Sequence, residues 1–245
     1  MTATVLPHTR DGLAFSIDDG SALRTGRFVG VALIVLMAAS SLINFSLEGS
    51  LFGTPGFLLN AAPHSQQVGF GAVLGMLAEM LYLGIAVAMF PVVSRRSQRM
   101  AVWLVAFAAV VLAAAVAESA SVMSMVSLSQ KYATASAADR EQLQTIRVVV
   151  SGARNWVHYL ARALDGGMIL AVFVVLYRFA LVPRILAAAG IGAAALMIVI
   201  IGRTLFGYEV IFPLLAPVGV AELALALWLI VKGLADGGGA RTRPR

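Results

Sequence analysis

Residues 28–47, FVGVALIVLMAASSLINFSL, form a run of twenty residues without a charged side chain. A helix of this length covers about 30 Å, which matches the hydrocarbon core of a bilayer. Arg24 and Arg27 precede the run, and Glu48 begins a stretch rich in Gly, Pro and Asn that follows it. We therefore predict that residues 28–47 are a membrane span and that an exposed loop comes after them.

The composition of the whole chain agrees with a membrane protein. Of its 245 residues, 60% are hydrophobic and 12% are charged, whereas soluble domains contain roughly 45–50% apolar and about 25% charged residues. The net charge is +6, but Lys and Arg lie in short segments between apolar runs, so nucleic acid is not an expected partner. No cysteine is present, which excludes disulfides and thiolate chemistry. We expect an all-α polytopic protein whose main partner is the lipid bilayer.

The apolar runs and the turn residues between them predict a bundle of six transmembrane helices. The five spans after the first cover roughly residues 68–93, 100–128, 154–177, 185–206 and 213–232. The polar segment 137–147 has helix-forming residues and is expected to lie along the membrane surface. Three parts of the chain follow from these boundaries: a polar tail (1–23), a six-span domain (24–235) and a flexible basic tail (236–245).

The distribution of positive charge predicts the orientation of the chain. With the amino terminus in the cytoplasm, twelve of the eighteen Lys and Arg residues lie on the cytoplasmic side. The opposite loops then contain three, Lys131, Arg140 and Arg147, and the remaining three fall inside spans. An excess of Lys and Arg marks cytoplasmic loops. Both termini are therefore predicted to be cytoplasmic.

Several segments resemble a bacterial family of six-span membrane proteins, the domain-of-unknown-function family numbered 4386. The similarity extends over most of the chain. It implies a six-helix protein of the bacterial inner membrane and supplies no established activity. The segments that carry it are RFVGVALIV (27–35), EMLYLGIAVAMFPVV (79–93), ARNWVHYL (153–160), VVLYRFALVPRILAAAGIGAA (174–194) and AELALALWLIVKGL (221–234).

Ionisable side chains inside the predicted spans are the candidate functional residues. Each ionised group in hydrocarbon costs about 2.5–3.5 kcal/mol on insertion scales, so it needs a partner, water or a function. Counting along the helices places all of them between the midplane and the outer face. These candidate binding residues are Glu79, Glu118, Arg154, His158, Arg162, Asp165, Arg203 and Glu222.

The spacing within the fourth span predicts that its polar residues share one face. Arg154, His158 and Arg162 recur every four residues, and Asp165 follows three residues later, which places them on one helical stripe. That stripe is expected to face the bundle and to contribute to an outward-opening polar pocket among spans two to six. Two interpretations stay open at this point: ion pairs that hold the helices in register, or a binding site.

Three functions are compatible with this pattern. The first is binding or transport of a small solute, the second is a noncatalytic accessory or sensory subunit, and the third is an intramembrane enzyme that uses His158 with Asp165 or Glu79 as its partner. The sequence favours a nonenzymatic protein, because it lacks the nucleophile motifs G-x-S-x-G and H-E-x-x-H. A Glu-x-x-His pair is also missing, and no second histidine lies within a span to ligate haem, so neither a metal nor a cofactor is expected. An oligomer or a protein partner is not indicated either way.

Overall fold

The structure is a computed structural model that describes residues 19–235. Six helices in this range are long and apolar enough to cross a membrane, which confirms the predicted all-α, six-span fold. The described residues contain no strand. Both predicted tails lie largely outside the described residues, except that the first helix already begins at Asp19. The six helices are α1 (Asp19–Leu42, continued by the π-helical turn η1, Ile43–Leu47), α4 (Ser65–Ser94), α5 (Gln98–Thr134), α6 (Ala137–Arg178), α7 (Arg184–Gly202) and α8 (Ala216–Lys232).

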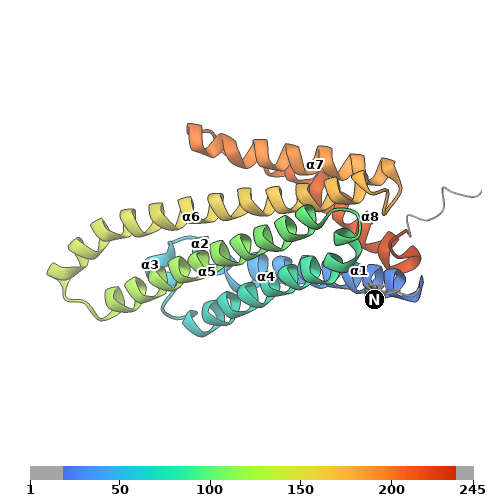
Figure 1. The fold of residues 1–245 in the computed structure, drawn as a ribbon. Coiled ribbons are helices and arrows are strands. Elements are labelled where there is room, and N and C mark those ends of the chain that lie inside the picture. The colour runs from blue at the N-terminus through green and yellow to red at the C-terminus, as the bar shows by residue number, and fades with distance from the viewer. Residues whose placement is uncertain (1–18, 236–245) are drawn as a thin grey trace, which may run out of the picture.

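The six long helices form a ring in the order of the sequence. Each packs against the next, from α1 through α4, α5, α6 and α7 to α8, and α8 returns to pack against α1. The bundle therefore has two ends (Figure 1). We call one the termini end, because residues 19 and 235 lie there with the turns at 95–97 and 179–183. The other is the hairpin end, where α5 turns into α6 at residues 135–136.

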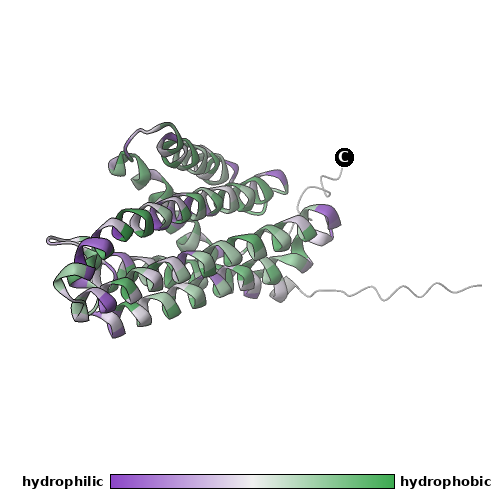
Figure 2. Ribbon diagram, turned by 90° about the vertical axis from the view of Figure 1, so that its left-hand side faces the viewer, coloured by the Kyte–Doolittle hydropathy of each residue, from purple (hydrophilic) through white to green (hydrophobic). Residues whose placement is uncertain are grey.

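Apolar side chains cover the outside of the bundle as well as its core. Phe45, Ile185 and Phe206 are each more than 80% exposed, and hydrophobic residues line the outer faces of the helices (Figure 2). A water-soluble protein rarely exposes apolar patches of this extent. Their exposure around the ring is the arrangement expected of helices that face lipid.

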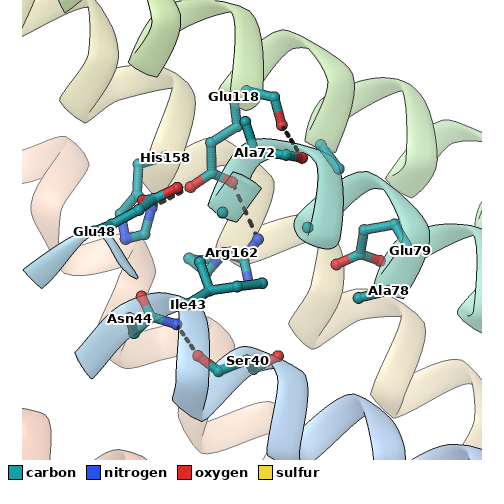
Figure 3. Close-up of a pocket in the computed structure, with 14 residues that line it drawn as sticks. Ser40, Ile43, Asn44, Glu48, Ala72, Ala78, Glu79, Glu118, His158 and Arg162 are labelled. Carbon is teal, nitrogen blue, oxygen red and sulfur yellow. Dashed lines mark hydrogen bonds and ion pairs between the residues drawn. The ribbon is translucent and has the colours of Figure 1, made fainter. Parts of the chain in front are cut away.

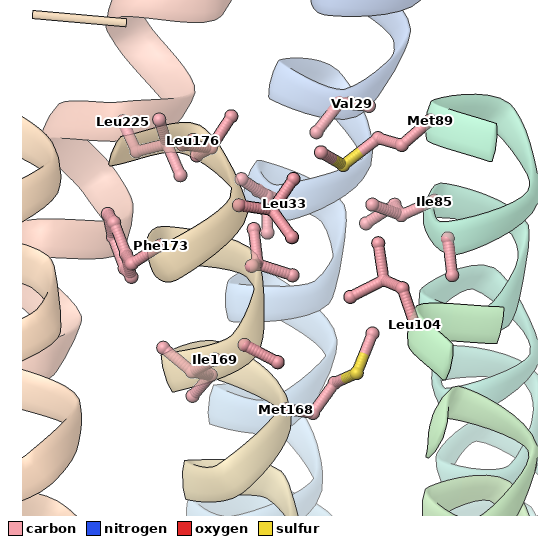
Figure 4. Packing of buried hydrophobic residues seen from close by; sticks show 14 of the residues in the cluster. Val29, Leu33, Ile85, Met89, Leu104, Met168, Ile169, Phe173, Leu176 and Leu225 are labelled. Atoms are coloured by element: carbon pink, nitrogen blue, oxygen red, sulfur yellow. The ribbon is translucent and has the colours of Figure 1, made fainter. Parts of the chain in front are cut away.

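The termini half of the ring is filled by a dry core. Its buried side chains come from all six helices, and they interlock across the centre of the bundle (Figure 4). They include Val29, Ile85, Leu104, Phe173 and Leu225. Apart from a void of about 10 Å³, these apolar side chains fill the ring on this side.

The stretch after the first span is a folded cap and not the exposed loop that the sequence predicts. It contains two one-turn helices, α2 (Gly49–Phe52) and α3 (Phe57–Asn60). Leu51 and Phe57 are buried against α5. Ser129 Oγ of α5 donates a hydrogen bond to the Leu58 carbonyl (2.8 Å) and accepts one from the Ala62 amide (2.8 Å). The prolines do prevent a continuous helix here, but short turns still bury their apolar side chains.

Residues 137–147 do not lie along the membrane surface, contrary to the sequence prediction. They are the first three turns of α6, which is a single helix of 42 residues, about 63 Å long. Ser136 caps this helix by accepting a hydrogen bond from the Asp139 amide. The partner helix α5 extends alongside it for 37 residues. Because both helices exceed the ~30 Å hydrocarbon core, their paired ends project beyond it as a helical hairpin.

We predict that Gly190→Ala destabilises the bundle. A Cβ atom at this position of α7 would overlap ring carbons of the buried Phe173, and overpacking of this kind costs about 1–3 kcal/mol. Gly192→Ala is the matched control, because no atom lies within 4 Å of its added Cβ. Thermal unfolding in detergent should show a lower Tm for the first variant only. Equal Tm values would contradict the packing of α7 on α6.

Candidate functional site

A group of ionisable side chains lies inside the hairpin half of the ring. Glu118 of α5 is at its centre and holds two residues of α6 (Figure 3). Its Oε1 atom accepts a hydrogen bond from His158 Nδ1 (2.6 Å), and its Oε2 atom accepts one from Arg162 Nη2 (3.1 Å). Arg162 also forms an ion pair with Asp165, with 2.8 Å between Nη1 and Oδ2. As the spacing predicts, the three α6 residues lie on one inward face.

Arg154 lies one turn closer to the hairpin end and interacts with the cap. Its Nη2 atom is 3.9 Å from Glu48 Oε2, and its guanidinium carbon is 4.3 Å from the centre of the Phe52 ring. Arg154 is buried, with 8% of its surface exposed. Burial raises the pKa of Glu48, and the Arg154 charge opposes this rise. The pair therefore fastens the cap to α6.

Two adjoining cavities are lined by these polar residues. The upper cavity lies next to the cap and offers about 60 Å³ to water-sized molecules, and the deep cavity below it offers about 290 Å³. Ser40, Glu79 and Arg162 line both, so the two share a wall. The upper cavity also contains Glu48, Glu118 and His158. The deep cavity also contains Tyr82, Asp165 and Glu222. Together they make a polar path from the cap towards the centre of the bundle.

The path ends at the dry core. A void of about 10 Å³ lies beyond Tyr82 and Glu222, and its other walls include Leu33, Ile85 and Phe173. A space of this size is at the lower limit for a single water molecule, and a water there needs several polar partners. The polar path and the apolar plug thus meet at the level of Glu222.

The structure brings together six of the eight residues that the sequence singles out. Arg154 lies outside the cavities and contacts Glu48 and Phe52 of the cap. Arg203 is separate from the cavities: it begins the short helix η2 (Arg203–Phe206) at the hairpin end of α7, and its guanidinium carbon lies 5.3 Å from the centre of the Tyr208 ring. The six residues that line the cavities are Glu79, Glu118, His158, Arg162, Asp165 and Glu222.

Glu48 and Tyr82 are cavity residues that the sequence analysis missed. The sequence pattern places Glu48 in a loop, yet it is the only Asp, Glu, Lys or Arg between Arg27 and Glu79. The available signal was that Glu48, a single acidic residue, ends the first apolar span, while the basic Arg154 lies at the same end of the fourth span. Tyr82 lies three residues after Glu79 and therefore on the same face of the helix, and this spacing was the available signal.

The contacts of His158 bear on the enzyme hypothesis. Its Nδ1 atom is hydrogen-bonded to Glu118 and not to Asp165 or Glu79, the partners considered from the sequence. Within residues 19–235 no serine hydroxyl is hydrogen-bonded to His158. Ser119 and Ser121 donate their hydroxyls to the Ala72 carbonyl (3.4 Å) and the Glu118 carbonyl (2.7 Å). The same residues hold no group of three His, Asp or Glu side chains that could bind a metal ion.

A double-mutant cycle tests the ion-pair centre. Glu118→Gln and Arg162→Gln should each lower the free energy of unfolding by about 1–3 kcal/mol, because each leaves a partly buried charge without its partner. The double variant should lose less than the sum, with a coupling of about 0.5–3 kcal/mol. Unfolding in mixed detergent micelles measures this, with the exposed Glu141→Gln as the control. Additive losses would show that the pair does not couple α5 to α6.

Comparison with known proteins identifies the family. The family model described as domain of unknown function DUF4386 matches residues 28–233. No curated protein and no solved structure matches the chain. The matched range begins in α1 and ends just after α8, so it includes parts of all six ring helices and every residue that lines the two cavities. The chain belongs to the DUF4386 family of domains of unknown function.

Proposed function

We propose that this protein is a nonenzymatic protein of a bacterial inner membrane that binds a small polar solute in the deep cavity. The cavities are entered from the hairpin end, which faces away from the cytoplasm, and both termini are cytoplasmic. One observation carries the proposal: the upper and deep cavities share Ser40, Glu79 and Arg162 and stop at an apolar plug. A polar route that ends inside the bundle suits a site that is open to one side at a time.

The volume and the walls of the deep cavity support a solute site. Its 290 Å³ is near the lower end of the range for small-molecule sites, which are mostly apolar with a few well-placed polar groups. Leu36, Ile169 and Val218 supply apolar wall, while Glu79 and Glu222 supply charge. Ion pairs that served only to hold helices in register would not require this open volume beside them.

Transport would need the plug to open, because no polar residue of the cavities continues past Glu222. We therefore propose binding as the function, and transport only as an extension of it.

A second candidate function, that of a noncatalytic accessory subunit, is favoured by the projecting part of α6. Val148 and Val149 are 64% and 71% exposed there, beyond the region that lipid is expected to cover, and exposed apolar residues of this kind are typical of partner contacts.

The orientation predicts opposite labelling of the two ends. Because the chain has no cysteine, single cysteines can be introduced at exposed positions without background. A membrane-impermeant maleimide should label Ala133→Cys, at the hairpin end, in intact spheroplasts. It should label Gln98→Cys, at the termini end, only after lysis. The reverse pattern would place the cavities on the cytoplasmic side and would contradict the proposed orientation.

Cysteine reactivity along α1 tests the cavities themselves. Ser40 lines both of them, whereas Ala38 is exposed and lines neither. A water-soluble methanethiosulfonate added from the hairpin side should modify Ser40→Cys at least about tenfold faster than Ala38→Cys, because the reaction needs a hydrated thiolate. Leu225→Cys, in the plug, should not react. A panel of sugars, amino acids, amines and organic acids should include a solute that protects Ser40→Cys; equal rates and no protection would refute the solute site.

A further inference from the structure

We propose that the ligand of the deep cavity is an organic cation, an amine or quaternary ammonium compound with a compact apolar body. This inference rests on the proposed solute site and specifies its chemistry. It follows from two features of the cavity: the excess of acidic over basic side chains on its walls, and the apolar surface between them.

The walls of the deep cavity contain more acidic than basic side chains. Glu79, Asp165 and Glu222 face a single cation, Arg162. That guanidinium is already bound to Asp165 and to Glu118 of the upper cavity, so it does not neutralise the other two carboxylates. Within residues 19–235, neither Glu79 nor Glu222 forms an ion pair or a hydrogen bond, and Figure 3 shows Glu79 apart from the paired group.

Asp165 adds an incompletely satisfied acceptor to the same wall. It is 9% exposed, and its Oδ2 atom accepts no hydrogen bond of good geometry although it lies 2.8 Å from Arg162 Nη1. Buried acceptors are normally hydrogen-bonded, and each exception calls for a cause. A positively charged ligand at this wall would give Glu79 and Glu222 the partner that they lack, beside the ion-paired Asp165.

The apolar part of the cavity favours an organic cation over a metal ion. Met37, Ile169 and Met197 form wall between the carboxylates, and the described residues hold no group of three ligands for a metal. The cavity volume of about 290 Å³ has room for a small organic molecule. Tyr82 adds an aromatic ring beside the carboxylates, and such rings attract quaternary ammonium groups through their faces.

The acidic side chains of the cavity argue against an anion. The one guanidinium on its walls, that of Arg162, is held by two carboxylates. An anion would have to displace one of these partners and would also face Glu79 and Glu222. Desolvated like charges repel strongly, so an anionic ligand is excluded by the same groups that attract a cation.

Three probes of similar shape and different charge test the inference: benzyltrimethylammonium, phenylmethanesulfonate and the neutral benzyl methyl sulfone. The cation alone should slow the modification of Ser40→Cys and raise the Tm of the purified wild-type chain as its concentration increases. In Glu222→Gln and in Glu79→Gln the apparent Kd for the cation should rise at least about tenfold. Glu209→Gln, in an exposed loop outside both cavities, is the control and should bind as the wild type does.

The outcomes separate this inference from the proposed function. Protection by the sulfonate or the sulfone, with no effect of the two glutamate substitutions, would overturn the cationic ligand while leaving a solute site in place. Failure of the cation to bind in the millimolar range would also overturn it. Absence of protection by these probes and by the whole solute panel would remove the solute site together with its ligand. If one glutamate variant unfolds, the other still decides the result.

Discussion

The cost of placing charge in hydrocarbon governs this structure. Each ionised side chain in the spans must find a counter-ion or a polar space inside the bundle, because lipid provides neither. Glu118 meets this requirement for two residues of α6 at once, through His158 and Arg162. The stripe on α6 therefore has to face α5, and this sets the rotation of the longest helix in the ring. The remaining helices close the ring around the polar face thus directed inward.

The two halves of the ring have opposite character, and their boundary is the place of functional interest. Towards the hairpin end the interior is polar and hollow, with the cap secured above it by Arg154 and Glu48. Towards the termini end it is apolar and tightly packed, with Phe173 filling the notch opposite Gly190. The ion pairs are compatible with the proposed binding site in this arrangement. They join α5 to α6 at Glu118, and the carboxyl groups of Glu79 and Glu222 line the deep cavity.

Much of the fold could be predicted from local sequence patterns. The errors occurred where contacts between distant segments determine the local structure. The six spans follow from uncharged runs such as residues 28–47, and the inward stripe follows from the spacing of His158, Arg162 and Asp165. The cap was missed because its glycines and prolines are typical of loops, while the burial of Leu51 depends on α5, about seventy residues later. The polarity of residues 137–147 predicts a surface helix separate from the fourth span, yet these residues are the first turns of α6 and pair with the end of α5.

The sequence by itself determined that the chain is a six-helix membrane protein and which ionisable side chains lie within its spans, because hydropathy and helical periodicity are local properties. Only the tertiary structure decided which of those charges meet. It joined Glu118 to His158 and Arg162, added Glu48 from the cap, and left Arg203 beside Tyr208 outside the cavities. The physical reason is that ion pairing depends on distances of a few ångströms between helices, and those distances are set by packing around the whole ring.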